Sequence, residues 1–484
     1  MSIGMMPLVH QARMDSRPAS RFHGKRVHFI GIGGCGMSGL ARMLLDAGAI
    51  VTGSDANPSD VVTELIRCGA QISCGQAGDL LNKQTDLVVR SAAIKSDNSE
   101  YAAAVELGLR QVKYAELLGM VMADSIGVAV AGTHGKSTTA AMIGYAMVEC
   151  GADPSIVVGG IVPQLGGSSR SGAGEVFVAE ACEFDRSFHR LHPTIALITN
   201  IEEDHLDCYN DIHEIVASFT AFARLVPPHG LIIAGGNDAR AREALAQVRS
   251  PIEWVGLSSA PGMNWSARVV GVEQGCWRGV VGHDGRELGE LRLAVAGEHN
   301  LQNALMAVAA CAACGVPAEK SIPALGRFTG VDRRMTVVGS VNGATVVDDY
   351  GHHPTEIRAT LEALRGKFKP RKLYCVFQPH QHSRTRFLME DFASSFQQAD
   401  ATIVPDIYFV RDSEAEKQKV SADDLVGRLK ANGRLAIHLS SFSDIVSHLR
   451  TVVGEGDLVV TMGAGNVWQI GKELAGGTNE SAHL

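Results

Sequence analysis

Short apolar runs, each followed by glycine or polar residues, recur along the chain and are separated by stretches long enough for a helix. Such runs are typical of strands buried in a parallel sheet, and the stretch 98–107 between two of them has a helical pattern. Strands that alternate with helices predict an α/β fold. The predicted strands are 27–30, 87–89, 125–130, 175–180, 194–200, 345–347, 373–377, 401–404 and 458–461.

The 484 residues suit about three domains, each with its own core. We expect a flexible leader at 1–23 and a Rossmann-like N-terminal domain at 24–122. A central domain of the P-loop ATPase type follows at 123–330, with a mostly parallel sheet. Alternating segments with a turn at 283–285 predict a small antiparallel excursion in its sheet. A second Rossmann-like domain completes the chain at 331–484.

Composition narrows the functional classes. A net charge of -8 leaves no basic surplus for gripping a phosphate backbone, so nucleic acid is a poor candidate partner. No run approaches the roughly 18 continuous apolar residues of a membrane span. Ten cysteines without a paired framework favour a reducing cytoplasm. Cys311 and Cys314 lie one turn apart in an alanine-rich stretch, which favours helix packing over metal binding.

The segment 124–139 carries the strongest chemical signal, because an apolar strand runs into a glycine loop that opens a helix. Gly132 and Gly135 allow tight turns that point backbone N–H groups inward. Lys136 reaches the β- and γ-phosphates, and Ser137 offers a hydroxyl to Mg²⁺. Val130 stands where the usual P-loop has its first glycine, so this is a shorter form of the motif.

A second glycine loop, G-I-G-G-C-G at 31–36, follows the first predicted strand and begins a helix. Asp55 lies beyond the next strand, where an acid often meets a ribose. NAD is one interpretation of this pattern. The loop fits any diphosphate-bearing ligand equally well.

Polar residues at predicted strand ends complete the candidate site. Glu180 and His205 could join Ser137 in holding Mg²⁺, or the acidic segment 202–204 could be a solvated loop that His205 merely caps. Polar residues at 297–303 could face a nucleotide base, although helix capping explains Asn300 as well.

Two histidine-rich loops, at 348–354 and 378–386, follow strands of the third domain. Neither provides a closed set of four ligands, and arginine or proline interrupts both. We therefore favour substrate and phosphate contacts over a structural metal site in these loops.

Five segments, in this order, resemble the motifs of the Mur ligase family. They are G-I-G-G-C-G-M-S-G from Gly31 to Gly39, G-T-H-G-K-S-T from Gly132 to Thr138, N-I-E-E-D-H-L-D from Asn200 to Asp207, G-E-H-N-L-Q-N from Gly297 to Asn303, and D-D-Y-G-H-H-P-T-E from Asp348 to Glu356. The resemblance spans all three predicted domains. It implies a domain for a uridine nucleotide sugar, an ATPase domain and a domain that brings an amino acid.

The resemblance also implies roles for particular residues. ATP contacts are implied for Gly132, Thr133, His134, Gly135, Lys136, Ser137, Thr138, His299, Asn300, Asn303, Arg333, Asp348 and Asp349. Sugar-nucleotide contacts are implied for Gly31, Gly33, Gly34, Gly36, Met37, Ser38, Ser54, Asp55 and Ser91. The implied Mg²⁺ ligands are Ser137, Glu180 and His205, and the implied catalytic residues are Lys136, His352 and Arg384. The chain departs from the family pattern at Cys182, Phe184, Arg186, Gln76, Arg90 and Tyr114.

The resemblance implies ATP- and Mg²⁺-dependent joining of L-alanine to the lactyl carboxylate of UDP-N-acetylmuramate. We expect a cytoplasmic monomer or homodimer without membrane insertion. A murein-tripeptide recycling ligase shares most of these motifs. Two alternatives come from other classes. A nicotinamide-dependent oxidoreductase would use the first glycine loop and would have no role for Lys136. A regulatory P-loop protein would bind ATP without joining two substrates.

Overall fold

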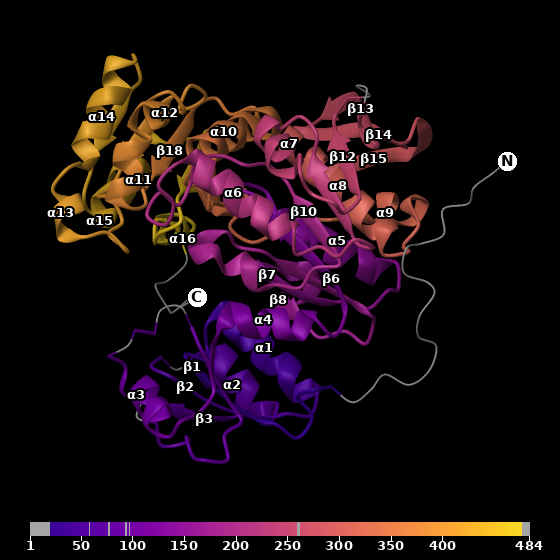
Figure 1. The fold of residues 1–484 in the computed structure, drawn as a ribbon. Helices are drawn as coiled ribbons and strands as arrows, with labels where there is room; N and C mark the ends of the chain where they lie inside the picture. Colours follow the sequence, from indigo (N-terminus) through magenta and orange to yellow (C-terminus); the bar gives the residue numbers. More distant parts are fainter. Residues whose placement is uncertain are drawn as a thin grey trace.

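The computed structural model describes residues 20–57, 59–75, 78–91, 94–95, 97–258 and 262–476. Most of the expected leader lies outside these residues, as does Gln76. The described residues form three sheets, each flanked by helices. In Figure 1 the three parts follow the colours of the chain, from indigo at the bottom to yellow at the upper left. The three-part α/β fold is therefore confirmed, whereas the domain boundaries stay predictions.

The N-terminal sheet is parallel and has the strand order β3-β2-β1-β4-β5. Its elements are β1 (Arg26–Ile30), α1 (Cys35–Asp46), β2 (Ile50–Asp55), α2 (Asp60–Arg67), β3 (Gln71–Cys74), β4 (Leu87–Arg90), α3 (Ser99–Glu106), β5 (Gln111–Lys113) and α4 (Tyr114–Met122). The chain leaves β1 toward β2 on one side and returns to β4 on the other. Ligands of open α/β sheets bind at such a switch point, where the first glycine loop lies.

The central sheet has the order β15-β14-β13-β12-β11-β10-β6-β9-β7-β8. Its strands are β6 (Ile126–Ala131), β7 (Ser155–Val162), β8 (Gly167–Arg170), β9 (Val176–Glu180), β10 (Ile195–Ile198), β11 (Leu231–Gly235), β12 (Ile252–Gly256), β13 (Trp265–Glu273), β14 (Cys276–His283) and β15 (Arg286–Ala296). Strands β13 to β15 form the expected antiparallel excursion, but β12 pairs parallel with β11 and belongs to the main sheet.

Helices cover both faces of the central sheet. They are α5 (Lys136–Glu149), α6 (Ile212–Ala223), α7 (Ala239–Leu245), α8 (Glu298–Ala313) and α9 (Ala318–Leu325), with 3-10 turns η1 (Pro163–Leu165) and η2 (Phe184–Arg190). Helix α8 is largely buried, which explains why its alanine-rich sequence shows little amphipathic pattern.

The C-terminal sheet has the order β16-β17-β21-β18-β19-β20 and is parallel except for the β16 edge. Its strands are β16 (Thr336–Val341), β17 (Ala344–Asp349), β18 (Leu373–Phe377), β19 (Ala401–Val404), β20 (Ala436–His438) and β21 (Leu458–Met462). Its helices are α10 (Pro354–Phe368), α11 (His382–Phe387), α12 (Met389–Ala393), α13 (Glu414–Lys417), α14 (Ala422–Ala431), α15 (Phe442–Val452) and α16 (Trp468–Leu474). The sequence pattern missed the short or exposed edge strands β16 and β20, which bury few side chains.

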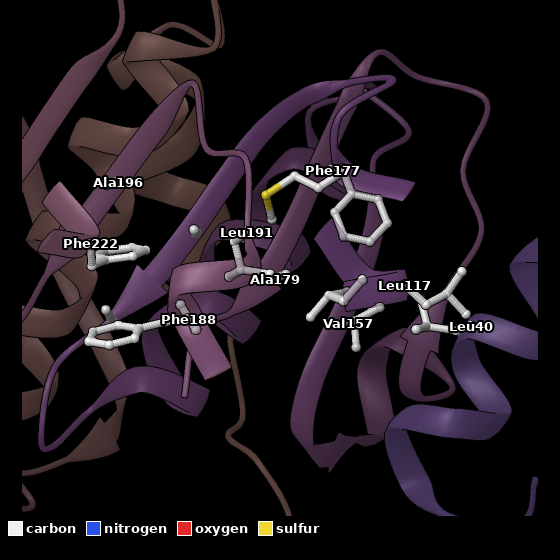
Figure 2. Close-up of a cluster of buried hydrophobic side chains, with 14 of the residues drawn as sticks. Leu40, Leu117, Val157, Phe177, Ala179, Phe188, Leu191, Ala196 and Phe222 are labelled. Carbon is white, nitrogen blue, oxygen red and sulfur yellow. The ribbon is translucent and has the colours of Figure 1, made fainter. Parts of the chain in front are cut away.

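The two junctions between sheets differ in kind. Leu40 of α1 and Leu117 of α4 pack in one apolar cluster with Val157 and Phe177 of the central sheet, so the first junction is apolar (Figure 2). The apolar clusters of the C-terminal sheet contain no central-domain residue among those described. Hydrogen bonds and ion pairs join the C-terminal domain to the central domain at this second, more polar junction.

No helix in the described residues is long and apolar enough to cross a membrane. This agrees with the absence of a long apolar run from the sequence.

Phe188 provides a test of the central core. Its ring is fully buried and stacks on Phe222 at a centroid distance of 4.8 Å (Figure 2). We expect Phe188→Ala to lower the free energy of unfolding by about 3–5 kcal/mol, because it leaves a cavity among rings. Urea unfolding measures the change, and Leu435→Ala, at a 67% exposed position, is the matched control. Equal effects of the two substitutions would contradict this packing.

Candidate active site

The phosphate loop lies between β6 and α5 and requires both of its glycines. Gly132 and Gly135 have φ angles of 135° and 82°, which side chains disfavour. A Cβ atom on Gly132 would collide with the Thr199 hydroxyl, and one on Gly135 would lie 2.6 Å from Asn303 Oδ1. The loop therefore turns tightly into the start of α5, and the N-terminus of a helix favours an anion.

Lys136 is held as a cation at this loop. Its Nζ donates to the Gly132 and Thr133 carbonyls at 2.6 and 3.0 Å and to Glu183 Oε1 at 2.9 Å. Burial opposes the charge, but Glu183 and its acidic neighbour Glu180 raise the pKa of Lys136 above its usual value. The ammonium group thus stays charged at physiological pH, with its three donors engaged by these oxygens.

The residues predicted to hold Mg²⁺ gather beside Lys136. Glu180 Oε2 accepts from the Ser137 hydroxyl and from the Gly159 N–H, both at 2.8 Å. His205 lines the same cavity, and its Nε2 lies 3.9 Å from Glu183 Oε1. Within the described residues, buried His205 Nδ1 and Glu183 Oε2 lack hydrogen-bond partners. Carboxylate and hydroxyl oxygens suit Mg²⁺, so this donor set fits the ion.

The loop is tied to the acidic segment after β10. Thr133 Oγ1 accepts from the Glu202 N–H at 2.8 Å, and the His134 N–H donates to Asn200 Oδ1 at 2.9 Å. Thr138 follows on the first turn of α5 and is absent from the residues that line the cavity. These bonds fix the phosphate loop against the segment that carries His205.

Asn300 and Asn303, predicted to contact the base, are buried beneath the phosphate loop. Asn300 Nδ2 donates to the Ala296 carbonyl at 2.7 Å, and Asn303 Nδ2 donates to Asn300 Oδ1 at 3.3 Å. The N-cap of α8 is Gly297, so Asn300 is not its cap. His299 remains exposed on the first turn of α8.

Arg333 and Asp348 lie together in the cavity wall, whereas Asp349 does not. Arg333 Nε donates to Asp348 Oδ2 at 2.9 Å, and both residues line the cavity. Asp349 instead accepts the N–H groups of Met335 and Gly351 at 2.8 and 2.7 Å. Burial raises the pKa of Asp349 to about 6. Its geometry is that of a residue that holds the loop after β17.

The predicted catalytic residues of the C-terminal domain face the phosphate loop. His352 Nδ1 lies 3.2 Å from the Tyr350 carbonyl, and burial lowers the pKa of His352 to about 4. Arg384 donates from Nε and Nη2 to Asp204 Oδ1 at 2.9 and 2.7 Å. Despite burial, Arg384 holds the pKa of Asp204 well below its usual range. The acidic segment is therefore not simply solvated, since Asp204 is buried.

The phosphate loop, the metal candidates and the predicted catalytic residues share one cavity of about 1240 Å³ between the central and C-terminal domains. Its lining includes Lys136, Ser137, Glu180, His205, Arg333, Asp348, His352 and Arg384. A nucleotide and an acceptor carboxylate fit such a space. The structure thus brings together the phosphate loop, the metal candidates and the C-terminal histidine and arginine.

Sequence reasoning missed part of the wall. Arg411 reaches the cavity from the C-terminal domain, and its Cζ lies 4.3 Å from the Phe184 ring centroid. Phe184 also meets His205 edge to face at 5.3 Å. Phe184 departs from the family pattern, and here it supports a metal candidate and an arginine at once. No signal in the sequence pairs positions so far apart.

Left-handed backbone also marks this wall. His205, Arg333 and Arg411 have φ angles of 52°, 60° and 60°. Such conformations are uncommon for non-glycine residues and gather at functional sites. All three residues line the cavity.

The predicted sugar-nucleotide residues lie apart from this cavity, at the carboxyl ends of the N-terminal strands. Asp55 Oδ2 accepts the Gly33 N–H at 2.7 Å, and a Cβ on Gly36 would meet the Tyr114 hydroxyl at 2.5 Å. Ser54 is fully buried and its hydroxyl contacts Glu100. The remaining candidates are Gly31, Gly34, Met37, Ser38 and Ser91, of which Met37 is buried in the apolar cluster.

Three family models match consecutive parts of the chain: "Mur ligase family, catalytic domain" at 26–125, "Mur ligase middle domain" at 130–311 and "Mur ligase, glutamate ligase domain" at 333–465. The chain is 42% identical over 450 residues to a UDP-N-acetylmuramate–L-alanine ligase of Acetivibrio thermocellus, covering 93% of this chain and 95% of the relative. It is 43% identical over 451 residues to the ligase of that name from Pelotomaculum thermopropionicum, covering 93% and 97%.

Two solved structures of Mur-type ligases are similar to the chain over nearly its whole length. A UDP-N-acetylmuramate-alanine ligase of Thermotoga maritima is 26% identical with a TM-score of 0.76, over 93% of this chain and 98% of that chain. A murein peptide ligase of Psychrobacter arcticus is 28% identical with a TM-score of 0.70, over 95% and 100%.

A substitution of Asp349 can distinguish a structural role of this residue from a role in nucleotide binding. We expect Asp349→Ala to lower the free energy of unfolding by about 1–3 kcal/mol, because two buried N–H groups lose their acceptor. The affinity for a non-hydrolysable ATP analogue should stay unchanged, whereas Asp348→Ala should weaken it. Urea unfolding and calorimetry measure the two properties. Weakened nucleotide binding by Asp349→Ala with unchanged stability would show that Asp349 contacts the nucleotide.

Proposed function

The chain belongs to the Mur ligase family, and on this premise we propose that it joins L-alanine to the lactyl carboxylate of UDP-N-acetylmuramate with ATP. One observation carries the proposal. Lys136 and the Ser137–Glu180 pair of the central domain open into the same cavity as His352 and Arg384 of the C-terminal domain. A phosphate site that faces groups from another domain suits transfer between two bound substrates.

The chemistry requires activation of the carboxylate, which is a poor electrophile in water. A lactyl oxygen attacks the γ-phosphorus, the bond from phosphorus to the β,γ-bridging oxygen breaks, and ADP leaves. The amine of L-alanine then attacks the acyl phosphate carbon. Loss of phosphate and of a proton leaves the amide. Both steps depend mainly on alignment and on neutralisation of charge.

Lys136 neutralises charge on the transferring phosphoryl group, because it is a fixed cation at the phosphate loop. We propose that Ser137, Glu180 and His205 hold Mg²⁺, which would supply further positive charge beside the phosphates. Phe184 and Glu183 keep His205 in place from two sides.

His352 suits removal of the amine proton. Burial lowers its pKa to about 4, so the ring is neutral at physiological pH. Nδ1 lies beside the Tyr350 carbonyl, which favours a proton on Nδ1 and a lone pair on Nε2. We propose that Nε2 accepts the proton as the amine attacks.

Arg384 has fewer donors left for substrate than a free guanidinium group would have. Nε and Nη2 both donate to Asp204. Nη1 makes a longer contact, 3.2 Å from His380 Nδ1, so it is the nitrogen that a substrate could engage more easily. We propose that Arg384 holds the two domains closed around the substrates and adds positive charge near the reacting carboxylate. Closure also keeps water from the acyl phosphate.

The first glycine loop is proposed to hold the uridine nucleotide at the start of α1. Tyr114 covers Gly36 there, and Asp55 keeps the loop in shape through Gly33. A nicotinamide oxidoreductase is not favoured, because its reaction would require neither Lys136 nor the cavity that Lys136 lines. We place the reaction in peptidoglycan precursor synthesis in the cytoplasm, by a monomer or homodimer, and the free cysteines of the described chain fit a reducing compartment.

Substrate selectivity tests the function. We expect repeated turnover of ATP to ADP only when UDP-N-acetylmuramate and an amino acid are both present, with L-alanine giving the highest kcat/KM. Glycine and L-serine should be turned over less well, because each changes the contents of a small pocket. A coupled ADP assay measures the rates. Turnover with the murein tripeptide alone would identify a recycling ligase, and NADH binding without ADP release would contradict ligase activity.

Lys136 tests the phosphate loop. We expect Lys136→Ala to lower kcat by about 10²-fold or more with the fold intact, because transition-state charge loses its fixed cation. Lys320 is an exposed lysine of the same domain, so Lys320→Ala is the control and should leave kcat unchanged. Circular dichroism checks folding. Near-normal turnover in Lys136→Ala would remove the loop from the mechanism.

A further inference from the structure

A compact group of His134, Glu202 and His353 lies outside the reaction path described above. One ligand atom from each residue lies within 4.8 Å of those of the other two. His134 belongs to the phosphate loop and Glu202 to the segment after β10, whereas His353 begins α10 of the C-terminal domain. The group therefore joins the two domains at the polar junction.

The hydrogen bonds orient the two imidazoles toward Glu202. His353 Nε2 lies 3.0 Å from the Glu203 carbonyl and so carries the proton, which leaves the Nδ1 lone pair 3.9 Å from Glu202 Oε2. His134 Nδ1 lies 3.5 Å from Glu356 Oε1. Metal-ligating histidines are held this way, with the other nitrogen on a carbonyl or carboxylate.

His134 Nε2 faces the Glu202 carboxylate without making a hydrogen bond in the described part of the chain. This atom is buried without a hydrogen-bond partner among the described residues, and it lies 3.6 Å from Glu202 Oε2. A lone pair directed at a carboxylate is unfavourable unless positive charge lies between them. Either a proton on the imidazole or a bound cation supplies this charge.

The distances suit a small metal ion. Ligand bonds of about 2.0–2.1 Å in a tetrahedral zinc site put ligand atoms about 3.3 Å apart. The Glu202 oxygen is within several tenths of an ångström of that separation from both imidazoles. The hydrogen bond from the Thr355 N–H to His353 Nδ1 is long, at 3.3 Å, and a metal would replace it. Thr355 Oγ1 also donates to Glu202 Oε2 at 2.7 Å, and a carboxylate oxygen can keep this bond while its other lone pair binds an ion.

A second, smaller cavity gives access to the group. It has a volume of about 410 Å³ and is lined by Glu202, His353 and Thr355, together with Arg358 and Asp391. An ion can enter from this side without passing the phosphate loop. Water in the cavity would complete four-coordination.

We propose that His134, Glu202 and His353 bind a divalent transition cation of the Zn²⁺ or Co²⁺ class. Two imidazoles select such ions over Mg²⁺, which prefers oxygen ligands. Because the ligands come from two domains, the ion holds the C-terminal domain against the phosphate loop. Bound metal therefore restrains domain opening.

Titration with Co²⁺ in excess Mg²⁺ tests the site, since Mg²⁺ occupies the predicted oxygen-rich site at Ser137 and Glu180. We expect one equivalent of Co²⁺ to give the visible absorption of a four-coordinate ion, and Zn²⁺ to displace it. Glu202→Gln and His353→Ala should each weaken binding at least tenfold. Circular dichroism and thermal unfolding check the fold of every variant.

His382→Ala is the matched control, because His382 is also buried, with Nδ1 lacking a hydrogen-bond partner in the described chain, and faces Asp412 at 3.8 Å. It should bind Co²⁺ like the unchanged protein. Three results would overturn the proposal: no saturable Co²⁺ binding in excess Mg²⁺, full binding by both Glu202→Gln and His353→Ala, or loss of binding only in His205→Ala.

Discussion

A buried ion pair between Asp204 and Arg384 joins the central and C-terminal domains. Each side chain is only 7% exposed, and their closest atoms are 2.7 Å apart. Removing either charge from water costs several kcal/mol, so each is tolerable there only with its partner. The N-terminal domain, by contrast, joins the central sheet through a continuous apolar cluster. Polar junctions permit relative motion more readily than apolar ones, so opening at the active site is expected at the Asp204–Arg384 junction.

The features that were predictable from the sequence are those that neighbouring residues determine. Gly132 and Gly135 were assigned to an anion loop from a short motif, and their left-handed backbone confirms why glycine is needed there. The parallel strands were predictable because burial on both faces makes them continuously apolar. The position of Ser137 beside Glu180 was also predictable from the sequence, because the carboxyl ends of parallel strands meet at one edge of the sheet.

The remaining features depend on contacts between residues that are distant in sequence. Asp204 and Arg384 are 180 positions apart, and nothing in either segment indicates that they pair. Neighbouring aspartates also diverge, because Asp348 enters the cavity while Asp349 turns to the backbone N–H groups behind it. A strand alternates its side chains between two faces, and the sequence does not say which face meets a ligand. Phe184 meets Arg411 only after both domains have folded and docked.

Glu183 explains how these separate features act together at the phosphate loop. Its Oε1 accepts from Lys136 at 2.9 Å and lies 3.9 Å from His205 Nε2, and the carboxylate is buried. A phosphate group that draws Lys136 toward itself weakens the Lys136–Glu183 contact and leaves Glu183 with less compensation for its charge. His205 is the adjacent group able to supply that compensation, by hydrogen bonding or as a ligand of a cation. If this site binds ATP and Mg²⁺ as proposed, the two binding events are coupled through one buried carboxylate.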